Sequence, residues 1–169
     1  MGLFRKSRIR RTRDGRYELA LPEIEREVLD DLAGQLSELL AATTDDPAVR
    51  RLFPTAYHDD VERDREYQQL VRDDLLERRL ANLATVQETA PAATELDEEQ
   101  VTAWMQAIND LRLVLGTRLD VSEEPVEVDL DDPAAPLLGV YDYLGYLMSE
   151  IVDALEAGLP PPTDTDPLS

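Results

Sequence analysis

The stretch QVTAWMQAINDLRLVLGTRL, residues 100–119, decides the fold that we expect for this chain. It contains Trp104, the only tryptophan, and its apolar residues recur at spacings of three and four. These apolar residues are Val101, Trp104, Met105, Ile108, Leu111, Leu115 and Leu119. Such spacing places side chains on one face of an α-helix. The stretch therefore predicts a core helix around which the rest of the chain is organised.

Polar residues interrupt this helix in its middle and near its end. They are Asn109, Asp110, Arg112 and Arg118. One interpretation is a half-buried hydrogen-bonded cluster, such as an ion pair of Asp110 with an arginine, that fixes the register of the helix. The other interpretation is a partner-binding face near the helix end. The sequence offers these residues no catalytic partner.

Apolar periodicity predicts further helices on both sides of this stretch. Asp97 and Gln100 form a capping-box pattern directly before it. In the last helix, Gly139 and Gly145 are expected to allow close approach of a neighbouring helix. The predicted elements are helices over 22–42, 59–88 and about 136–157, a short helical turn over 48–53, and a short strand over 126–129. We expect a mainly α fold, a bundle of about four helices with an amino-terminal β-hairpin.

The amino-terminal residues 3–21 predict this hairpin. Asp14-Gly15 is typical of a type I′ turn, and the flanking residues alternate in part. The basic side chains would line its solvated face, where they either protect an exposed strand edge or contact a partner or nucleic acid. The candidate contact residues are Arg5, Lys6, Arg8, Arg10, Arg11 and Arg13.

Charge and composition suggest how the chain is divided. Residues 1–16 carry a net charge of +6 and the whole chain −20, so the remainder carries −26. An acidic body repels nucleic acid and anionic membrane, and a halophilic surface is a competing explanation of the acidity. Only the basic segment offers an electrostatic handle for a polyanion or an acidic protein face. We expect a basic hairpin arm (1–21) within the same domain, an acidic helical domain (22–158) and a disordered tail (159–169).

No motif predicts catalysis, a cofactor or a metal. The chain has no cysteine, which excludes disulfides, thiolate catalysis and cysteine-ligated metals. His58 is the only histidine, so no site with two histidine ligands can form. Adjacent acids such as Glu98 and Glu99 point apart on a helix, and the glycines form no phosphate-binding motif. We therefore expect a protein that is not an enzyme.

No segment predicts export or membrane insertion. The amino terminus lacks the continuous apolar region of a secretory signal. The apolar run 137–155 contains Asp142, Glu150 and Asp153, too many charges for a membrane span. We expect a cytoplasmic protein.

A family resemblance rests on the run WMQAINDLRLVLGTRL, residues 104–119. It extends to the basic start FRKSRIRR, the acidic helix after Pro22 and the closing helix with Tyr141-Asp142-Tyr143-Leu144. These features resemble a small actinobacterial family, the AosR-like proteins, long known only as a domain of unknown function. The resemblance implies an oxidative-stress transcriptional regulator that acts with a stress sigma factor and senses oxidation through a CxxxC disulfide. Because this chain has no cysteine, the thiol switch does not carry over.

Two functions of different class remain as hypotheses. The first is a transcription-associated regulator that acts through RNA polymerase or a sigma factor, with phosphate contacts from the basic arm. If the arm neutralised about five phosphates, log affinity would fall with log salt concentration at a slope of about −4.5. The alternative is an adaptor in Clp-type regulated proteolysis, because genes of this family often lie beside that of the Clp adaptor. A homo-oligomer with its interface on helix 137–155 is a third hypothesis.

Overall fold

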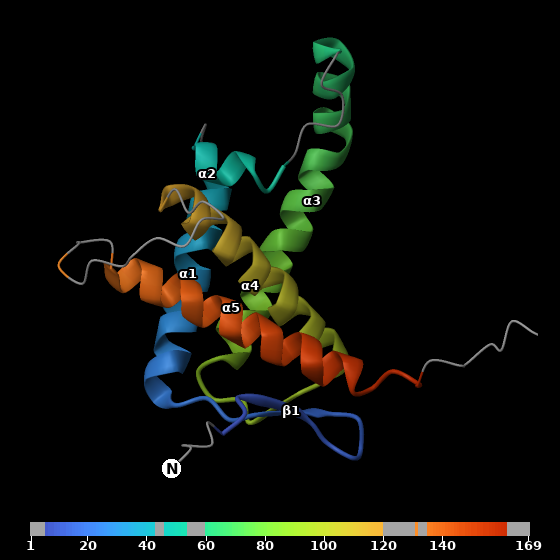
Figure 1. The fold of residues 1–169 in the computed structure, drawn as a ribbon. Helices are drawn as coiled ribbons and strands as arrows, with labels where there is room; N and C mark the ends of the chain where they lie inside the picture. The colour runs from blue at the N-terminus through green and yellow to red at the C-terminus, as the bar shows by residue number, and fades with distance from the viewer. Residues whose placement is uncertain (1–5, 43–45, 54–59, 120–130, 132–134, 162–169) are drawn as a thin grey trace, which may run out of the picture.

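The computed structural model describes residues 6–42, 46–53, 60–119, 131 and 135–161 (Figure 1). The fold is mainly helical with one small sheet, so the predicted fold class is confirmed. Arg5, His58, the strand expected over 126–129 and the tail from residue 162 lie outside the described residues. The helices are α1 Glu23–Ala41, α2 Pro47–Arg50, α3 Val61–Thr89, α4 Glu98–Arg118 and α5 Ala135–Glu156. The strands are β1 Ile9–Arg11, β2 Tyr17–Leu19 and β3 Glu95–Leu96.

Helix α4, predicted as the organising element, occupies the centre of the molecule. It contacts the four other helices and β3, and Trp104 on it is fully buried. The indole Nε1 donates a hydrogen bond to Thr89 Oγ1 at 2.8 Å, which satisfies the only polar atom of that side chain. The predicted capping box is confirmed, because Asp97 and Gln100 each bond the backbone N–H of the other. The start of α4 is therefore fixed by local sequence and its position by core packing.

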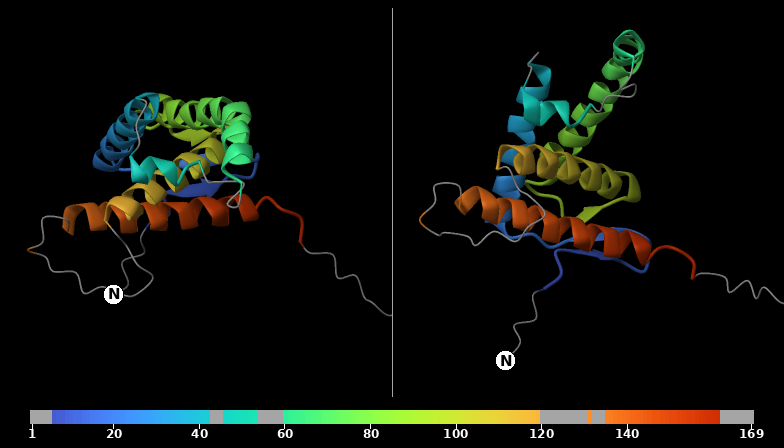
Figure 2. Two further views of the ribbon diagram at one scale, coloured as in Figure 1. Left: turned by 90° about the horizontal axis from the view of Figure 1, so that it is seen from above. Right: turned by 45° about the horizontal axis from the view of Figure 1, so that its top comes forward.

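The other long helices surround α4. Helix α1 packs on α3, while α5 crosses the opposite side of α4 and contacts β1 (Figure 2). Helix α3 is the longest, and its amino-terminal turns extend beyond the rest of the molecule (Figure 1). Exposed charged side chains such as Glu62 and Arg63 cover these turns. One continuous hydrophobic core joins the helices to the buried residues of the sheet.

The hairpin is present, but its turn differs from the prediction. The Gly15 N–H donates to Thr12 O at 3.1 Å, so Arg13 and Asp14 are the central residues of the turn. Gly15 follows with a φ of 81°, a conformation that favours glycine. The type I′ turn at Asp14-Gly15 was therefore the wrong prediction. The observed three-residue loop uses glycine as a bulge that restores the twist between the strands.

The sheet also contains a third strand that the sequence did not predict. β2 pairs with β1 on one side and with β3 on the other, and both pairings are antiparallel. Tyr17, Leu19 and Leu96 are buried where the sheet meets the helices. Only two residues of β3 pair, which is too short for an alternating pattern.

The two glycines of α5 behave differently. A Cβ at Gly145 would lie 3.3 Å from the guanidinium of Arg112, so this glycine allows α4 and α5 to approach closely. A Cβ at Gly139 would meet nothing within 4 Å among the residues that the structure describes. The prediction was right for Gly145 and wrong for Gly139, which instead lines a groove beside α1.

Candidate functional site

The structure pairs several of the basic hairpin residues with acids of the same chain. Arg8 bonds Glu25 of α1, Arg10 bonds Glu18 across the hairpin, and Arg16 bonds Glu95 of β3. The pairs of Arg10 and Arg16 are exposed, whereas Arg8 and Glu25 are each only 19% exposed. A large part of the positive charge that the sequence places in this segment is therefore neutralised within the fold.

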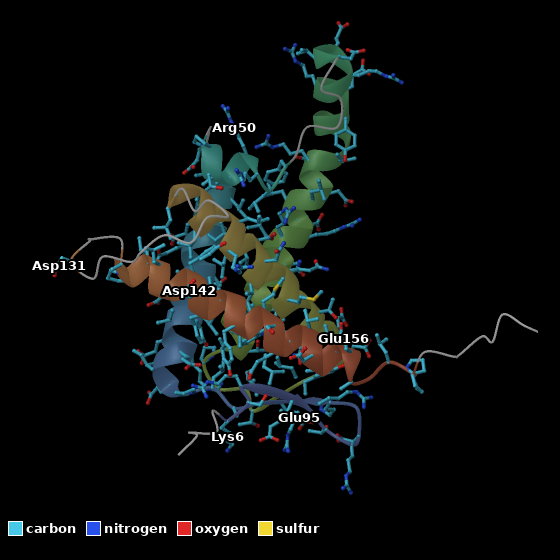
Figure 3. The ribbon with its side chains drawn as sticks, in the orientation of Figure 1. Lys6, Arg50, Glu95, Asp131, Asp142 and Glu156 are labelled. Atoms are coloured by element: carbon cyan, nitrogen blue, oxygen red, sulfur yellow. The ribbon has the colours of Figure 1, made fainter. Side chains whose placement is uncertain are left out.

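The remaining described candidates on the hairpin are Lys6, Arg11 and Arg13. Lys6, which Figure 3 labels, is exposed, and so is Arg13. Arg11 lies against Gly158 beyond the end of α5, and its Nε is buried without a hydrogen-bond partner. Among the described candidates, only Lys6 and Arg13 are exposed cations that form no ion pair, although the charge of Lys6 also acts on Glu18.

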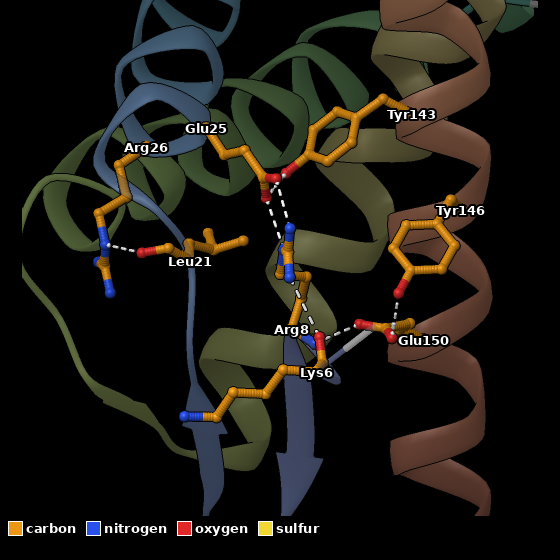
Figure 4. Close-up of polar contacts among 8 residues, drawn as sticks. All are labelled: Lys6, Arg8, Leu21, Glu25, Arg26, Tyr143, Tyr146 and Glu150. Atoms are coloured by element: carbon orange, nitrogen blue, oxygen red, sulfur yellow. Dashed lines mark hydrogen bonds and ion pairs between the residues drawn. The ribbon is translucent and has the colours of Figure 1, made fainter. Parts of the chain in front are cut away.

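Arg8 is the centre of a polar network that joins the sheet to two helices (Figure 4). Its Nε and Nη2 donate to the two carboxylate oxygens of Glu25 at 3.0 and 2.9 Å. The hydroxyl of Tyr143 donates to Glu25 Oε2 at 2.8 Å. On the other side, the backbone N–H of Arg8 and the hydroxyl of Tyr146 both donate to Glu150, at 2.6 and 2.7 Å. We name Arg8, Glu25, Tyr143, Tyr146 and Glu150 the hairpin network.

The charges in this network support each other. The charge-assisted bond to Glu25 raises the pKa of the Arg8 guanidinium. Burial, followed by the hydrogen bond to the Glu25 carboxylate, raises the pKa of the Tyr143 phenol. The hydroxyl of Tyr143 therefore stays protonated near neutral pH and remains a hydrogen-bond donor. No local sequence pattern indicates this network, because Tyr143 lies 118 positions from Glu25 along the chain.

The polar residues of α4 do not come together as one site. Asn109 is exposed. Asp110 is buried and pairs with Arg79 of α3, and Arg112 lies 4.8 Å from the centre of the Tyr141 ring of α5. Arg118 bonds Asp46, the N-cap of α2, at 3.1 Å. These contacts join α4 to three different elements.

The Arg79–Asp110 pair is the most deeply buried ionic contact in the described part of the chain. Asp110 is 2% exposed, and burial raises the pKa of its carboxyl while the guanidinium of Arg79 lowers it. Arg79 also donates to the backbone carbonyl of Leu52 at 2.7 Å and lies over the ring of Phe53. The pair therefore holds α3, α4 and the segment after α2 together. Arg79 lies three positions after Leu76 and four before Leu83, both of which face the core. This spacing could have indicated that Arg79 is partly buried.

A shallow groove lies between the first halves of α1 and α5. It has a volume of about 240 Å3 and is lined by Ile24, Glu25, Val28, Pro136, Gly139, Val140 and Tyr143. A larger depression of about 740 Å3 lies between α3 and the start of α4, and most of its lining is polar or acidic. Within the described residues, no group of three or more His, Asp or Glu side chains could hold a metal ion. None of the described helices has the length and apolarity that a membrane span requires.

Comparison with known proteins identifies the family and the relatives of this chain, which the geometry alone does not. Residues 5–155 match the family described as a domain of unknown function, DUF2017. The oxidative stress regulator AosR of Mycobacterium tuberculosis H37Rv is 27% identical, in an alignment that covers 83% of each chain. The putative oxidative stress regulator AosR of Mycobacterium leprae is 31% identical over 69% of this chain and 62% of its own. No solved structure matches.

Proposed function

The chain belongs to the DUF2017 family, and from this membership we propose that it is a non-enzymatic, transcription-associated regulator of the oxidative stress response that acts through protein partners. RNA polymerase or a sigma factor is the partner that we propose. The mycobacterial relatives carry the name oxidative stress regulator, which supports the regulatory role. We place the protein in the cytoplasm, where transcription takes place.

The observation that carries this proposal is the internal pairing of the hairpin arginines. Binding to nucleic acid depends mainly on cations that neutralise phosphates. Arg8 and Arg10 are bonded to Glu25 and Glu18, and a phosphate would have to compete with these carboxylates. The rest of the chain is strongly acidic and repels a polyanion. Contact with a protein therefore fits this surface better than contact with DNA.

The regulator that we propose works without a thiol switch. The chain contains no cysteine, so neither a disulfide nor a sulfenic acid can form on it. Any response to oxidants would reach this protein through its partner or through its abundance in the cell.

Affinity purification of the tagged full-length chain from its native cell tests the proposal. We expect RNA polymerase subunits or a sigma factor among the recovered proteins, and the same proteins from the double variant Lys6→Ala/Arg13→Ala. Recovery of Clp subunits in their place would overturn the proposal in favour of an adaptor in regulated proteolysis. Loss of polymerase from the double variant, or after nuclease treatment, would show that DNA mediates the contact.

A further inference from the structure

The groove between α1 and α5 combines exposed apolar residues from two helices. Ile24 of α1 is 66% exposed, and Pro136 at the start of α5 is exposed as well. Val28 and Val140 continue the apolar lining between the two helices. Large apolar side chains that are exposed together, in a depression, are typical of a surface that binds another protein.

The polar groups of the groove are already satisfied from within the fold. Both carboxylate oxygens of Glu25 accept hydrogen bonds from Arg8, and the hydroxyl of Tyr143 donates to the same carboxylate (Figure 4). The hairpin network therefore holds this side of the groove in a fixed shape. An occupant of the groove would meet mainly apolar atoms and would not have to replace these bonds.

Besides Glu25, which pairs with Arg8, the two walls carry acids that form no ion pair within the described part of the chain. On α1, Glu27 lies three positions after Ile24, and Asp31 lies three positions after Val28. On α5, Asp142 lies three positions after Gly139 and is exposed (Figure 3). Residues three apart are neighbours on a helix surface, so these acids flank the apolar lining. Helix α5 contains no basic residue, and α1 contains only Arg26. The guanidinium of Arg26 donates to the backbone carbonyls of Leu21 and Ala90.

Gly139 leaves the groove open at its centre. A Cβ at this position would meet no atom of the described residues within 4 Å, although the residue lines the groove. Glycine destabilises the interior of a helix, so helix stability does not explain a glycine at position 139. The missing side chain creates room for an apolar side chain from outside.

We propose that the α1–α5 groove binds the apolar face of a basic amphipathic helix from a partner protein. The groove lies where α5 crosses beside α1 (Figure 1), and its lining is mainly apolar. An apolar groove can accept the side chains that a helix presents at positions i and i+3 or i+4. The flanking acids select Lys or Arg on the sides of that helix. A second copy of this chain would bring a net charge of −20 to an acidic surface, and the connection 120–134 is acidic as well. This inference rests on one part of the proposed function, namely that the chain acts through a protein partner.

The test uses a synthetic amphipathic peptide as the probe. It is roughly 18 residues long, about five helical turns, with leucines on one face and lysines on the other. A matched peptide carries glutamate in place of every lysine. Binding of each fluorescein-labelled peptide to the full-length protein is measured by fluorescence anisotropy. We expect the lysine peptide to bind at least about tenfold more tightly than the glutamate peptide, a difference of about 1.4 kcal/mol.

Variants of the protein then locate the binding site. Gly139→Leu fills the groove from within and increases helix propensity, so we expect a folded protein with at least about tenfold weaker binding of the lysine peptide. Ile24→Glu should weaken binding to a similar extent. Leu113→Glu, which places the same charge on an exposed apolar position of α4, is the control and should bind like the wild type.

The outcomes separate this inference from the proposed function. Equal binding by the wild type and the Gly139→Leu variant would overturn the inference, even if polymerase is recovered in the affinity purification. Loss of binding in Gly139→Leu would support it, even if no polymerase or sigma factor is recovered. A wild-type dimer in light scattering that Gly139→Leu dissociates would show that a second copy occupies the groove, and would also overturn it.

Discussion

Two arginine–carboxylate pairs hold this fold together, and they differ in their surroundings. Arg79 and Asp110 lie between α3 and α4, where the aspartate is 2% exposed. Arg8 and Glu25 lie between the sheet and α1, where each side chain is 19% exposed and Tyr143 shares the carboxylate. The first pair belongs to the core, whereas Glu25 of the second pair lines the α1–α5 groove.

The contrast between the two pairs shows two uses of charge in a strongly acidic protein. Removing one partner of a pair in the core destabilises the folded state, because the other charge stays buried without compensation. A pair at a groove contributes less to stability but determines which groups a partner would meet. We therefore expect disruption of the first pair to affect mainly folding, and disruption of the second to affect both the hairpin and the groove.

The largest expected effect is that of Arg79→Ala. The substitution leaves Asp110 buried without its partner and removes the bond to Leu52 O, so the free energy of unfolding should fall by about 3–5 kcal/mol. Urea unfolding followed by the fluorescence of the buried Trp104 measures this change. The double variant Arg79→Met/Asp110→Leu should recover much of the loss. A single variant as stable as the wild type would show that the pair is not structurally important.

The next largest effect is expected for Arg8→Ala. This change removes two charge-assisted hydrogen bonds to Glu25, and the free energy of unfolding should fall by about 1.5–3 kcal/mol. Because Arg8 also joins β1 to α1, amide hydrogens of the hairpin should exchange faster with solvent. The exchange of amides in the middle of α4 should change less. A uniform change in both regions would contradict the local role of this pair.

Tyr143→Phe should give a smaller effect that depends on pH. The loss of one hydrogen bond to Glu25 should cost about 1 kcal/mol near neutral pH. The pKa of Tyr143 is raised in the folded state, so its stabilising contribution is present below the unfolded value of about 10 and is lost as pH rises above it. The stability difference between wild type and variant should therefore narrow between about pH 8 and about pH 11. A difference that stays constant would show that the phenol is not protected from ionisation.

The smallest effect is expected for Arg10→Ala. Arg10 and Glu18 form an exposed pair with side chains 71% and 41% exposed, and such pairs contribute little to stability. Urea unfolding at neutral pH should give the wild-type midpoint within error. The hydrogen bond from Arg10 lowers the pKa of Glu18, and NMR titration of the variant should show that pKa rising towards its usual value. An unchanged Glu18 titration would indicate that the two side chains do not pair in solution.

Local sequence signals predicted the helical part of this fold well. The capping box at Asp97 and the apolar spacing around Trp104 located α4, because both act over a few residues. The hairpin followed from Asp14-Gly15, although the glycine bulge placed the turn one position earlier. Strand β3 could not be predicted, since it exists only through pairing with β2.

The candidate sites were harder to predict because they depend on contacts between distant segments. The sequence shows the charge of Arg8, Arg10 and Arg16 but not that each bonds an acid of the same chain. The groove depends on the space beside Gly139, which only the position of α5 beside α1 reveals. The sequence shows where the charged residues are, whereas the fold determines which of them can contact a partner.

Two binding titrations test whether this protein contacts a protein partner or DNA phosphates. The fluorescently labelled full-length chain is titrated with purified RNA polymerase holoenzyme of its own organism and, separately, with promoter DNA at several salt concentrations. We predict saturable binding to the holoenzyme that Lys6→Ala/Arg13→Ala leaves unchanged, and no specific binding to DNA. Absence of holoenzyme binding, together with DNA affinity that falls with log salt at a slope of about −4.5, would contradict the account.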